Sequence, residues 1–331
     1  MPGENLTRIE AQERRAIVDT HAYEISLDLR RGAEVFDSRS VVRFSATPGA
    51  ATFIDLIARQ VRSITLNGRQ IDPGAFADSR IALDGLEAEN ELRVVADCAY
   101  TNTGEGLHRF VDPVDGEVYL YTQFEVPDSR RVFAVFEQPD LKATFAFTVT
   151  APAAWEVVSN QPTPAPEALG TKADPTGTGA GDVEVARWAF EPTPRISSYI
   201  TALVAGPYVV ERSELTSSDG RTIPLGVFCR ASLADHMDAD YVFDKTREGF
   251  AFFESAFEHP YPFDKYDQLF VPEYNMGAME NAGCVTFTET YVFRSKVTDA
   301  VKERRVVTIL HELAHMWFGD LVTMKWWNDL W

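Results

Sequence analysis

Two histidines and a glutamate close to the end of the sequence have the spacing of a metal site. His311 and His315 are four residues apart and flank Glu312, so on a helix both imidazoles lie on one face and can hold one zinc ion. Glu312 would lie about 100° around the helix axis, close enough to take a proton from water. The pattern predicts the zinc centre of a hydrolase. The alternative is a surface helix with two titratable histidines.

The residues around this motif predict a buried helix. Apolar side chains recur at helical spacing before, within and just after it: Val306, Val307, Ile309, Leu310, Leu313, Ala314 and Trp317. Gly319 is placed to end the helix in a left-handed conformation. Burying two imidazoles and a carboxylate without partners is costly, and a metal ion would offset that cost. The zinc site is therefore favoured over the surface helix.

A second segment lies shortly before this helix and carries Gly277, Ala278, Met279, Glu280 and Asn281. Together with the histidine motif, it resembles the zinc aminopeptidases of the aminopeptidase N family. Residues 121–125, 136–145 and 317–323 resemble the same family. Glu137 is a small departure, because the family more often has Asp at this place.

The resemblance implies a reaction and a role for each site residue. His311 and His315 would be ligands of one Zn²⁺ ion, and Glu312 would be the general base for the attack of water on a peptide bond. The expected activity is the release of N-terminal amino acids from peptides.

The same resemblance implies how a peptide with a free N-terminal amine is bound. Residues 277–281 would run beside the peptide like an added strand, so that Gly277, Ala278, Met279 and Asn281 all contribute to substrate binding. Glu280 would bind the α-amine, Glu125 would be its second carboxylate partner, and Gln123 would line the same pocket. From the residues alone, Glu280 could instead be a capping or salt-bridge residue. Glu125 could equally be a solvent-facing strand residue.

Composition restricts the partners. The 331 residues include 31 Lys and Arg against 50 Asp and Glu, which gives a net charge of −19. This charge argues against nucleic acid and anionic membranes as partners. Three widely spaced cysteines and a polar beginning without an apolar leader favour a cytoplasmic protein with reduced thiols. We expect the full-length protein to be a monomer.

The order of patterns along the sequence predicts two domains and an α+β fold. Residues 1–206 carry alternating strand patterns with a tight hairpin at Asn67-Gly68, a long loop over 170–181 and a last strand over 199–204. Together with the resemblance, this predicts an N-terminal antiparallel all-β, saddle-like domain. Residues 207–331 carry a hairpin, a helix over 241–257 and a short edge strand over 268–272, which ends in a proline. These would form the first half of a thermolysin-like α/β metallopeptidase domain.

One ligand of the expected metal site is absent from the sequence. In the family, a glutamate with eighteen residues between it and the second histidine completes the site, which here would be position 334, three beyond Trp331. We therefore expect an N-terminal fragment of an aminopeptidase, truncated before its third zinc ligand. Two alternatives are a non-catalytic fragment and the leukotriene-hydrolase branch of the family. Ala278 disfavours that branch, which usually has a second glycine at this position.

Overall fold

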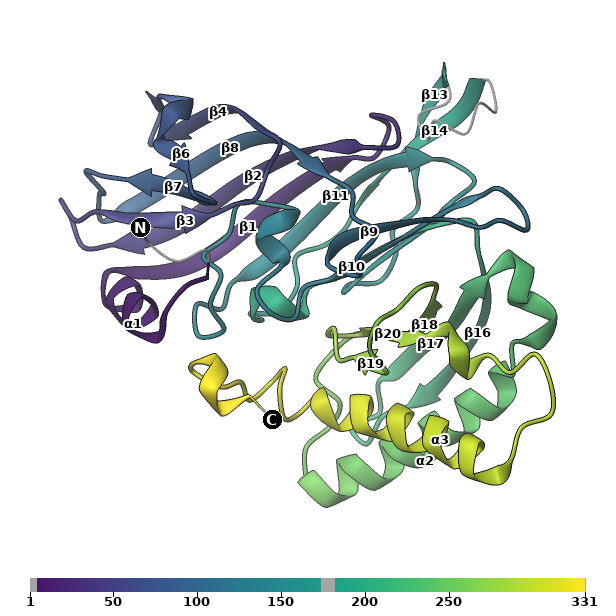
Figure 1. The fold of residues 1–331 in the computed structure, drawn as a ribbon. Helices are drawn as coiled ribbons and strands as arrows, with labels where there is room; N and C mark the ends of the chain where they lie inside the picture. The colour runs from purple at the N-terminus through teal and green to yellow at the C-terminus, as the bar shows by residue number, and fades with distance from the viewer. Residues whose placement is uncertain (1–4, 174–181, 331) are drawn as a thin grey trace.

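A computed structural model describes residues 5–173 and 182–330. Two parts lie one above the other in Figure 1, a large assembly of strands and a smaller unit of strands and helices. The buried apolar side chains of both parts belong to one continuous hydrophobic core. In the described ranges, no helix combines the length and the apolar character needed to cross a membrane.

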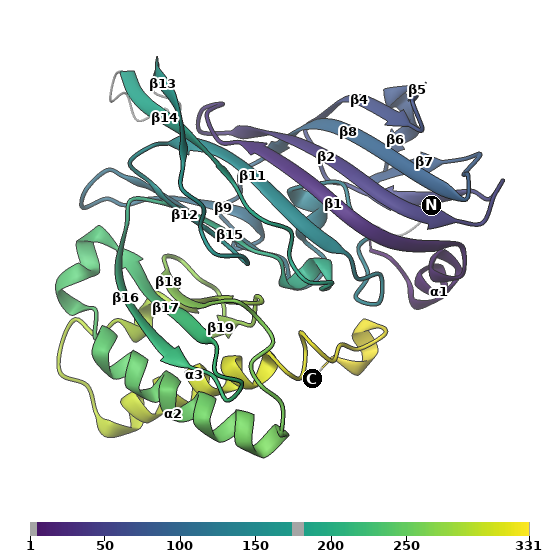
Figure 2. The ribbon, with the colours of Figure 1, turned by 180° about the vertical axis from the view of Figure 1, so that it is seen from behind.

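An eight-stranded sheet forms the larger part (Figures 1 and 2). Its strand order is β13-β14-β11-β1-β2-β8-β4-β5, with bounds β1 Val18–Asp28, β2 Val35–Ala46, β4 Gln60–Leu66, β5 Arg69–Ile71, β8 Glu89–Ala99, β11 Thr144–Pro152, β13 Glu167–Ala173 and β14 Asp182–Ala189. The expectation of a purely antiparallel sheet is wrong, because β1 and β11 pair in parallel. The tight hairpin is confirmed: Asn67 and Gly68 join β4 to β5 with φ values of 51° and 79°.

Two smaller sheets complete this part. One has the order β12-β15-β10-β9, with β9 Gly106–Val111, β10 Val118–Gln123, β12 Glu156–Ser159 and β15 Leu203–Gly206. The other has the order β3-β7-β6, with β3 Thr52–Asp55, β6 Phe76–Ala77 and β7 Arg80–Leu83. The expected strand over 199–204 is partly wrong. Residues Ser198–Ile200 form a 3₁₀ turn that Thr201 closes through a hydrogen bond of 2.7 Å from its hydroxyl to the Ser198 carbonyl.

This part is also not all-β, because it begins with helix α1 (Arg8–Ile17). The side chain of Thr7 accepts a hydrogen bond from the Glu10 amide (3.3 Å), and Glu10 accepts one from the Thr7 amide (2.8 Å). These reciprocal bonds satisfy amides at the start of the helix that have no partner within it. The capping residues were present in the sequence and give a physical reason for this helix.

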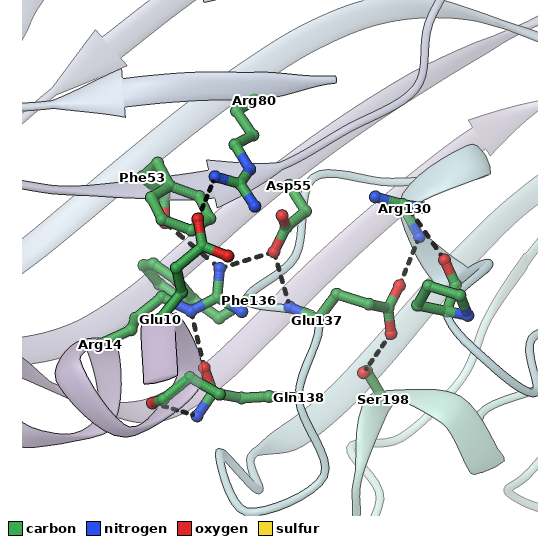
Figure 3. A network of polar contacts seen from close by, with 12 residues as sticks. Glu10, Arg14, Phe53, Asp55, Arg80, Arg130, Phe136, Glu137, Gln138 and Ser198 are labelled. Atoms are coloured by element: carbon green, nitrogen blue, oxygen red, sulfur yellow. Dashed lines mark hydrogen bonds and ion pairs between the residues drawn. The ribbon is translucent and has the colours of Figure 1, made fainter. Parts of the chain in front are cut away.

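A buried polar network fastens α1 to the sheets (Figure 3). Arg14 is 1% exposed and donates to Asp55 (2.6 Å) and to Gln138 (2.7 Å). The Glu137 amide donates to the same Asp55 carboxylate (3.1 Å), while the Glu137 carboxylate accepts from Ser198 (3.0 Å). The network therefore connects α1 and β3 to the turn at residues 198–200.

The smaller part is a five-stranded sheet with two helices. The strand order is β16-β17-β18-β20-β19, with β16 Tyr208–Thr216, β17 Thr222–Arg230, β18 Tyr266–Val271, β19 Ala278–Met279 and β20 Cys284–Thr288. The expectation that the strand near residue 268 is an edge strand is wrong, because β18 is central. Pro272 follows the last residue of β18, so its missing N–H removes no bond from the ladder.

Helices α2 (Ala239–Phe257) and α3 (Asp299–His315) pack side by side (Figure 1). A Cβ at Gly249 of α2 would lie 2.6 Å from a methyl carbon of Leu310 and 2.8 Å from one of Leu313. Glycine therefore permits the close approach of the two helices. The expected end of α3 at Gly319 is wrong: the helix ends at His315 and Met316 caps it, because the chain turns so that the Phe318 carbonyl reaches the His315 ring.

Three further predictions concern the loop over 170–181, the cysteines and the boundary between the domains. The expected loop over 170–181 is wrong at its start, because residues up to Ala173 belong to β13, and its remainder lies outside the described residues. The three cysteines are free and buried. The last strand of the larger part ends at Gly206 and β16 begins at Tyr208 in another sheet. The domain division into 1–206 and 207–331, like the cytoplasmic location, stays a prediction.

Candidate active site

Helix α3 brings the two histidine rings together. The Nε2 atoms of His311 and His315 are 3.0 Å apart. The Nδ1 of His315 lies 2.9 Å from the Phe318 carbonyl, which can only accept, so this nitrogen carries the proton and Nε2 presents a lone pair. Burial lowers the pKa of both histidines, and each is therefore biased to the neutral form that binds metals.

The two ring nitrogens fit two positions of a zinc site. Tetrahedral zinc with Zn–N bonds of about 2.0–2.1 Å would separate its nitrogen ligands by roughly 3.3 Å, close to the 3.0 Å observed between the Nε2 atoms. A carbonyl that orients the second ring nitrogen is also usual for zinc-binding histidines. Within residues 5–173 and 182–330, no group of three or more His, Cys, Asp or Glu side chains is arranged to hold a metal. The described residues therefore account for two ligands.

Glu312 lies beside the histidines in a cavity of about 330 Å³. The cavity is lined by Gly277, Ala278, Arg304, Val307, Thr308, His311 and Glu312. The Glu312 side chain is buried, and burial, together with the nearby Glu280 and Glu125 carboxylates, raises its pKa to about 9. In the metal-free chain this carboxyl is therefore protonated at neutral pH, and it can act as a base only when a nearby positive charge lowers its pKa.

Residues 277–281 form the outer edge of the smaller sheet. Strand β19 pairs with β20 through Ala278 opposite Phe287 and Met279 opposite Thr286, and the Thr288 amide donates to the Gly277 carbonyl at 3.0 Å. The other edge of β19 has no strand partner in the described part of the chain. An extended peptide could pair there through backbone hydrogen bonds.

Two further carboxylates converge on this region from different parts of the molecule. Glu280 is 6% exposed and follows β19, whereas Glu125 is partly buried and follows β10. Burial raises the pKa of each to about 7, and the Glu280 charge adds to the effect on Glu125. Among the described residues, no hydrogen bond from another residue lowers the pKa of either carboxyl group. Their shared negative charge favours a positively charged ligand.

The remaining expected site residues are placed differently. Gln123 lies at the end of β10, where its side-chain carbonyl accepts a 2.5 Å hydrogen bond from Tyr274, and its amide nitrogen is buried without a partner among the described residues. Asn281 donates to Thr286 at 3.2 Å. Met279 is 1% exposed and belongs to the hydrophobic core, so its side chain does not line the cavity.

Sequence reasoning missed several residues of this site. Arg304 and Thr308 line the cavity and lie seven and three positions before His311, so helical periodicity could have found them. Val307, four positions before His311, was expected only as part of the apolar face of the helix, and it lines the cavity too. Asp320 is 1% exposed, and both of its carboxylate oxygens are buried without a hydrogen-bond partner in the part of the chain that the structure describes. Burial and the Glu280 charge raise its pKa well above the usual value. Asp320 lies in the segment 317–323 that resembles the family, but no spacing gave it a role.

The sequence of this chain is similar to those of known peptidases. The sequence matches the Peptidase M1 N-terminal domain over residues 85–200 and the Peptidase family M1 domain over residues 241–331. It is 61% identical to the aminopeptidase N of Streptomyces lividans over all of this chain and 37% of that protein. Human aminopeptidase N is 35% identical over 91% of this chain and 32% of its own length. Mouse aminopeptidase N is 36% identical over 75% of this chain and 24% of its own length.

The chain thus spans about a third of the length of the curated relatives that it matches. Two different domains of one family match in their expected order, and the similarity to the Streptomyces protein covers the whole sequence. The chain belongs to the peptidase M1 family.

Proposed function

We propose that this chain is part of a zinc-dependent aminopeptidase that removes N-terminal residues from peptides. The observation that carries the proposal is that His311 and Glu312 line one cavity with Gly277 and Ala278, beside the edge of β19 that has no strand partner among the described residues. The relatives named aminopeptidase N support the same reaction.

The acidic residues near the cavity explain how a free N-terminus would be selected. Glu280 is buried and Glu125 is partly buried, and their two negative charges repel each other. A protonated α-amine between them would supply the missing positive charge. An internal peptide bond has no cation to offer, so binding it would leave buried carboxylates unpaired at a cost of several kcal/mol.

The backbone of residues 277–281 would hold the peptide in register. A Cβ added at Gly277 would meet its nearest described atom, the Tyr291 hydroxyl, only at 3.8 Å. The space beside this residue is therefore open to an incoming main chain. Pairing along β19 would place the first peptide bond next to the histidines and Glu312.

His311 and His315 would hold zinc through their Nε2 atoms, and a bound zinc ion would supply the Lewis acidity that makes water nucleophilic near neutral pH. Glu312 would accept the proton of the attacking water and pass it to the leaving amine. Burial raises its pKa in the metal-free chain, and the positive charge of a bound zinc ion would lower that pKa and favour the carboxylate form that the reaction needs. The expected products are a free amino acid and a shortened peptide.

Metal analysis and kinetics on the full-length gene product test the proposal. We expect one zinc ion per molecule, loss of activity on removal of zinc by a chelator, and recovery on zinc addition. Free-amine peptides should be cleaved and their N-acetylated forms should not. Equal cleavage of both forms by the zinc-loaded protein would contradict the proposed role of Glu280 and Glu125.

The non-catalytic alternative applies to the 331 residues taken alone. It is favoured by the presence of only two histidine ligands among the described residues, without a third metal-binding side chain beside them. We expect the isolated chain to lose zinc on dialysis against a mild chelator and to show no aminopeptidase activity. Stoichiometric zinc after such dialysis would contradict this expectation.

A further inference from the structure

The turn before the proposed substrate-binding strand is held by the larger part of the molecule. This turn, Glu273 to Asn275, connects β18 to β19. Glu273 has a φ of 53°, a left-handed conformation that a non-glycine residue adopts only at some cost. The Tyr121 hydroxyl of β10 donates to the Glu273 carbonyl at 3.3 Å. The hydrogen bond from Tyr121 therefore stabilises the turn at Glu273, the residue with the unfavourable backbone conformation.

His108 of β9 holds the side chain of the same residue. Its Nε2 lies 3.2 Å from a carboxylate oxygen of Glu273, and its Nδ1 accepts a 3.0 Å hydrogen bond from the Gly104 amide. Because an amide N–H can only donate, the ring proton is on Nε2 and is directed to Glu273. The imidazole is 1% exposed and stacks on Tyr121 with ring centroids 4.7 Å apart. Its tautomer and orientation are thus both determined.

The other two residues of the turn are held as well. The Tyr274 hydroxyl donates to Gln123 at 2.5 Å and lies 3.0 Å from the Thr286 hydroxyl. The Asn275 side chain donates to the Thr103 carbonyl at 2.5 Å. A Cβ at Gly104 would lie 2.4 Å from the Asn275 side-chain nitrogen, so only glycine permits this contact. Three consecutive residues therefore contact β9, β10 or the loop before β9.

The strand that follows this turn is short and makes few backbone hydrogen bonds to the sheet, although the Met279 side chain is buried in the core. Strand β19 contains two residues and pairs with β20 only through Ala278 and Met279. Met276, between the turn and the strand, is 36% exposed. So short an edge strand opens easily unless its flanking residues are fixed.

We propose that His108 is a positioning residue. Its hydrogen bond to Glu273 fixes strand β19 beside helix α3. The inference rests on the proposed function for its catalytic consequence, but the placement of β19 can be measured without catalysis. Through Glu273, the larger part of the molecule sets where residues 277–281 lie relative to His311 and Glu312.

Amide hydrogen exchange on this chain tests the positioning directly. The reporter is the Thr288 amide, which donates to the Gly277 carbonyl. We expect H108A and E273G to accelerate its exchange by about tenfold or more. Each variant removes the hydrogen bond between the His108 ring and the Glu273 carboxylate. E273G keeps the left-handed backbone without strain, and Glu273 is 55% exposed, so this variant should fold even if H108A does not.

Two controls distinguish the effect of the His108–Glu273 hydrogen bond from a general loss of stability of the sheet. E273Q retains a side-chain oxygen that can accept from His108, and we expect it to exchange nearly like the wild type. H236A removes an exposed histidine of the same type and should change nothing. Unchanged Thr288 exchange in E273G would overturn the proposal, as would equal acceleration of amides throughout the central strands β17 and β18.

Kinetics on the zinc-loaded full-length protein supply the second readout. We expect E273G to raise the KM for peptides about tenfold with a smaller change in kcat, and E273Q to restore most of the loss, because the misplaced strand weakens peptide binding more than the reaction at the metal. A wild type without aminopeptidase activity would contradict the proposed function, and the exchange experiment would still decide the role of His108. A fall in kcat alone, with KM unchanged, would contradict the positioning role.

Discussion

Buried acids occur in two regions of this molecule, and they differ in their partners. Asp112, which follows β9 and accepts a hydrogen bond from Arg230 at the end of β17, is fully buried. Burial alone would raise its pKa, but hydrogen bonds from Ser232, the Val114 amide and Arg230 hold it below the usual value. Glu280, beside the proposed active site, is almost as buried and has its pKa raised to about 7. A buried carboxyl group thus has hydrogen-bond donors and a cation beside it in one region and lacks them among the described residues in the other.

The comparison distinguishes structural acids from binding acids. Asp55 receives Arg14 and the Glu137 amide within the network of Figure 3. In the described residues, no hydrogen bond from another residue lowers the pKa of Glu280 or Glu125. A folded protein tolerates the cost of buried, unpaired charge mainly where a ligand removes it. We therefore expect substitutions in the two regions to have opposite effects on stability and activity.

The largest expected effect concerns Glu312. E312Q should lower the kcat of the zinc-loaded full-length protein by about 10²–10⁴-fold, because it removes the proposed base, while zinc content stays the same, because Glu312 is not a proposed ligand. E303Q, the same change at an exposed position of α3, should keep full activity. Retained turnover in E312Q with zinc bound would remove Glu312 from the mechanism.

The next effect concerns recognition of the amine. E280A should lower kcat/KM for free-amine peptides by a factor that corresponds to about 2–5 kcal/mol of transition-state stabilisation, the cost of losing one partner of a buried charge pair. Its effect should appear largely as a higher KM. E258A changes an exposed glutamate at the end of α2 and should leave both constants unchanged. If E280A cleaved free-amine peptides as well as the wild type, the amine would be bound elsewhere.

In the paired region, the expected loss is in stability. R14M leaves Asp55 buried without its cation and should lower the free energy of unfolding by about 3–5 kcal/mol. Urea unfolding followed by circular dichroism measures this change. R15M, at the neighbouring exposed position of the same helix, should cost much less. A small effect of R14M would show that paired burial contributes little to stability here.

The smallest expected effect is a gain in stability. Because the pKa of Glu280 is raised from 4.5 to about 7 in the folded chain, the folded state binds the proton more tightly and its stability falls as the pH rises between these values. E280Q removes this loss, so we expect the metal-free chain to gain about 1–3 kcal/mol at pH 8 and nothing at pH 4.

Thermal or urea unfolding of E280Q and the wild type across this pH range provides the check. D112N, the matched change in the paired region, should instead lower stability, because the amide cannot accept all the hydrogen bonds that the carboxylate receives. A destabilised E280Q at pH 8 would erase the distinction between the two regions.

Local sequence patterns predicted the elements of the site better than its assembly. Helical spacing around His311 and His315 predicted α3, and the Asn67-Gly68 pair predicted the hairpin of β4 and β5. The end of α3 was wrong because the His315 ring bonds to the Phe318 carbonyl, a contact that no propensity encodes. The central place of β18 and the burial of Asp320 depend on packing between distant segments. The roles of the site residues came from family resemblance and stay proposals.

The parallel pairing of β1 with β11 has a consequence for how the chain folds. Strand β1 pairs with β2 as soon as that hairpin has formed, but its other edge is covered by β11, where Ala22 lies opposite Thr144. Until that distant segment has been synthesised, β1 presents an open row of amides and carbonyls that can pair with another nascent chain. Closure of such long-range pairs is slow. The first half of the larger sheet thus keeps one edge open to other chains until residues 144–152 have left the ribosome.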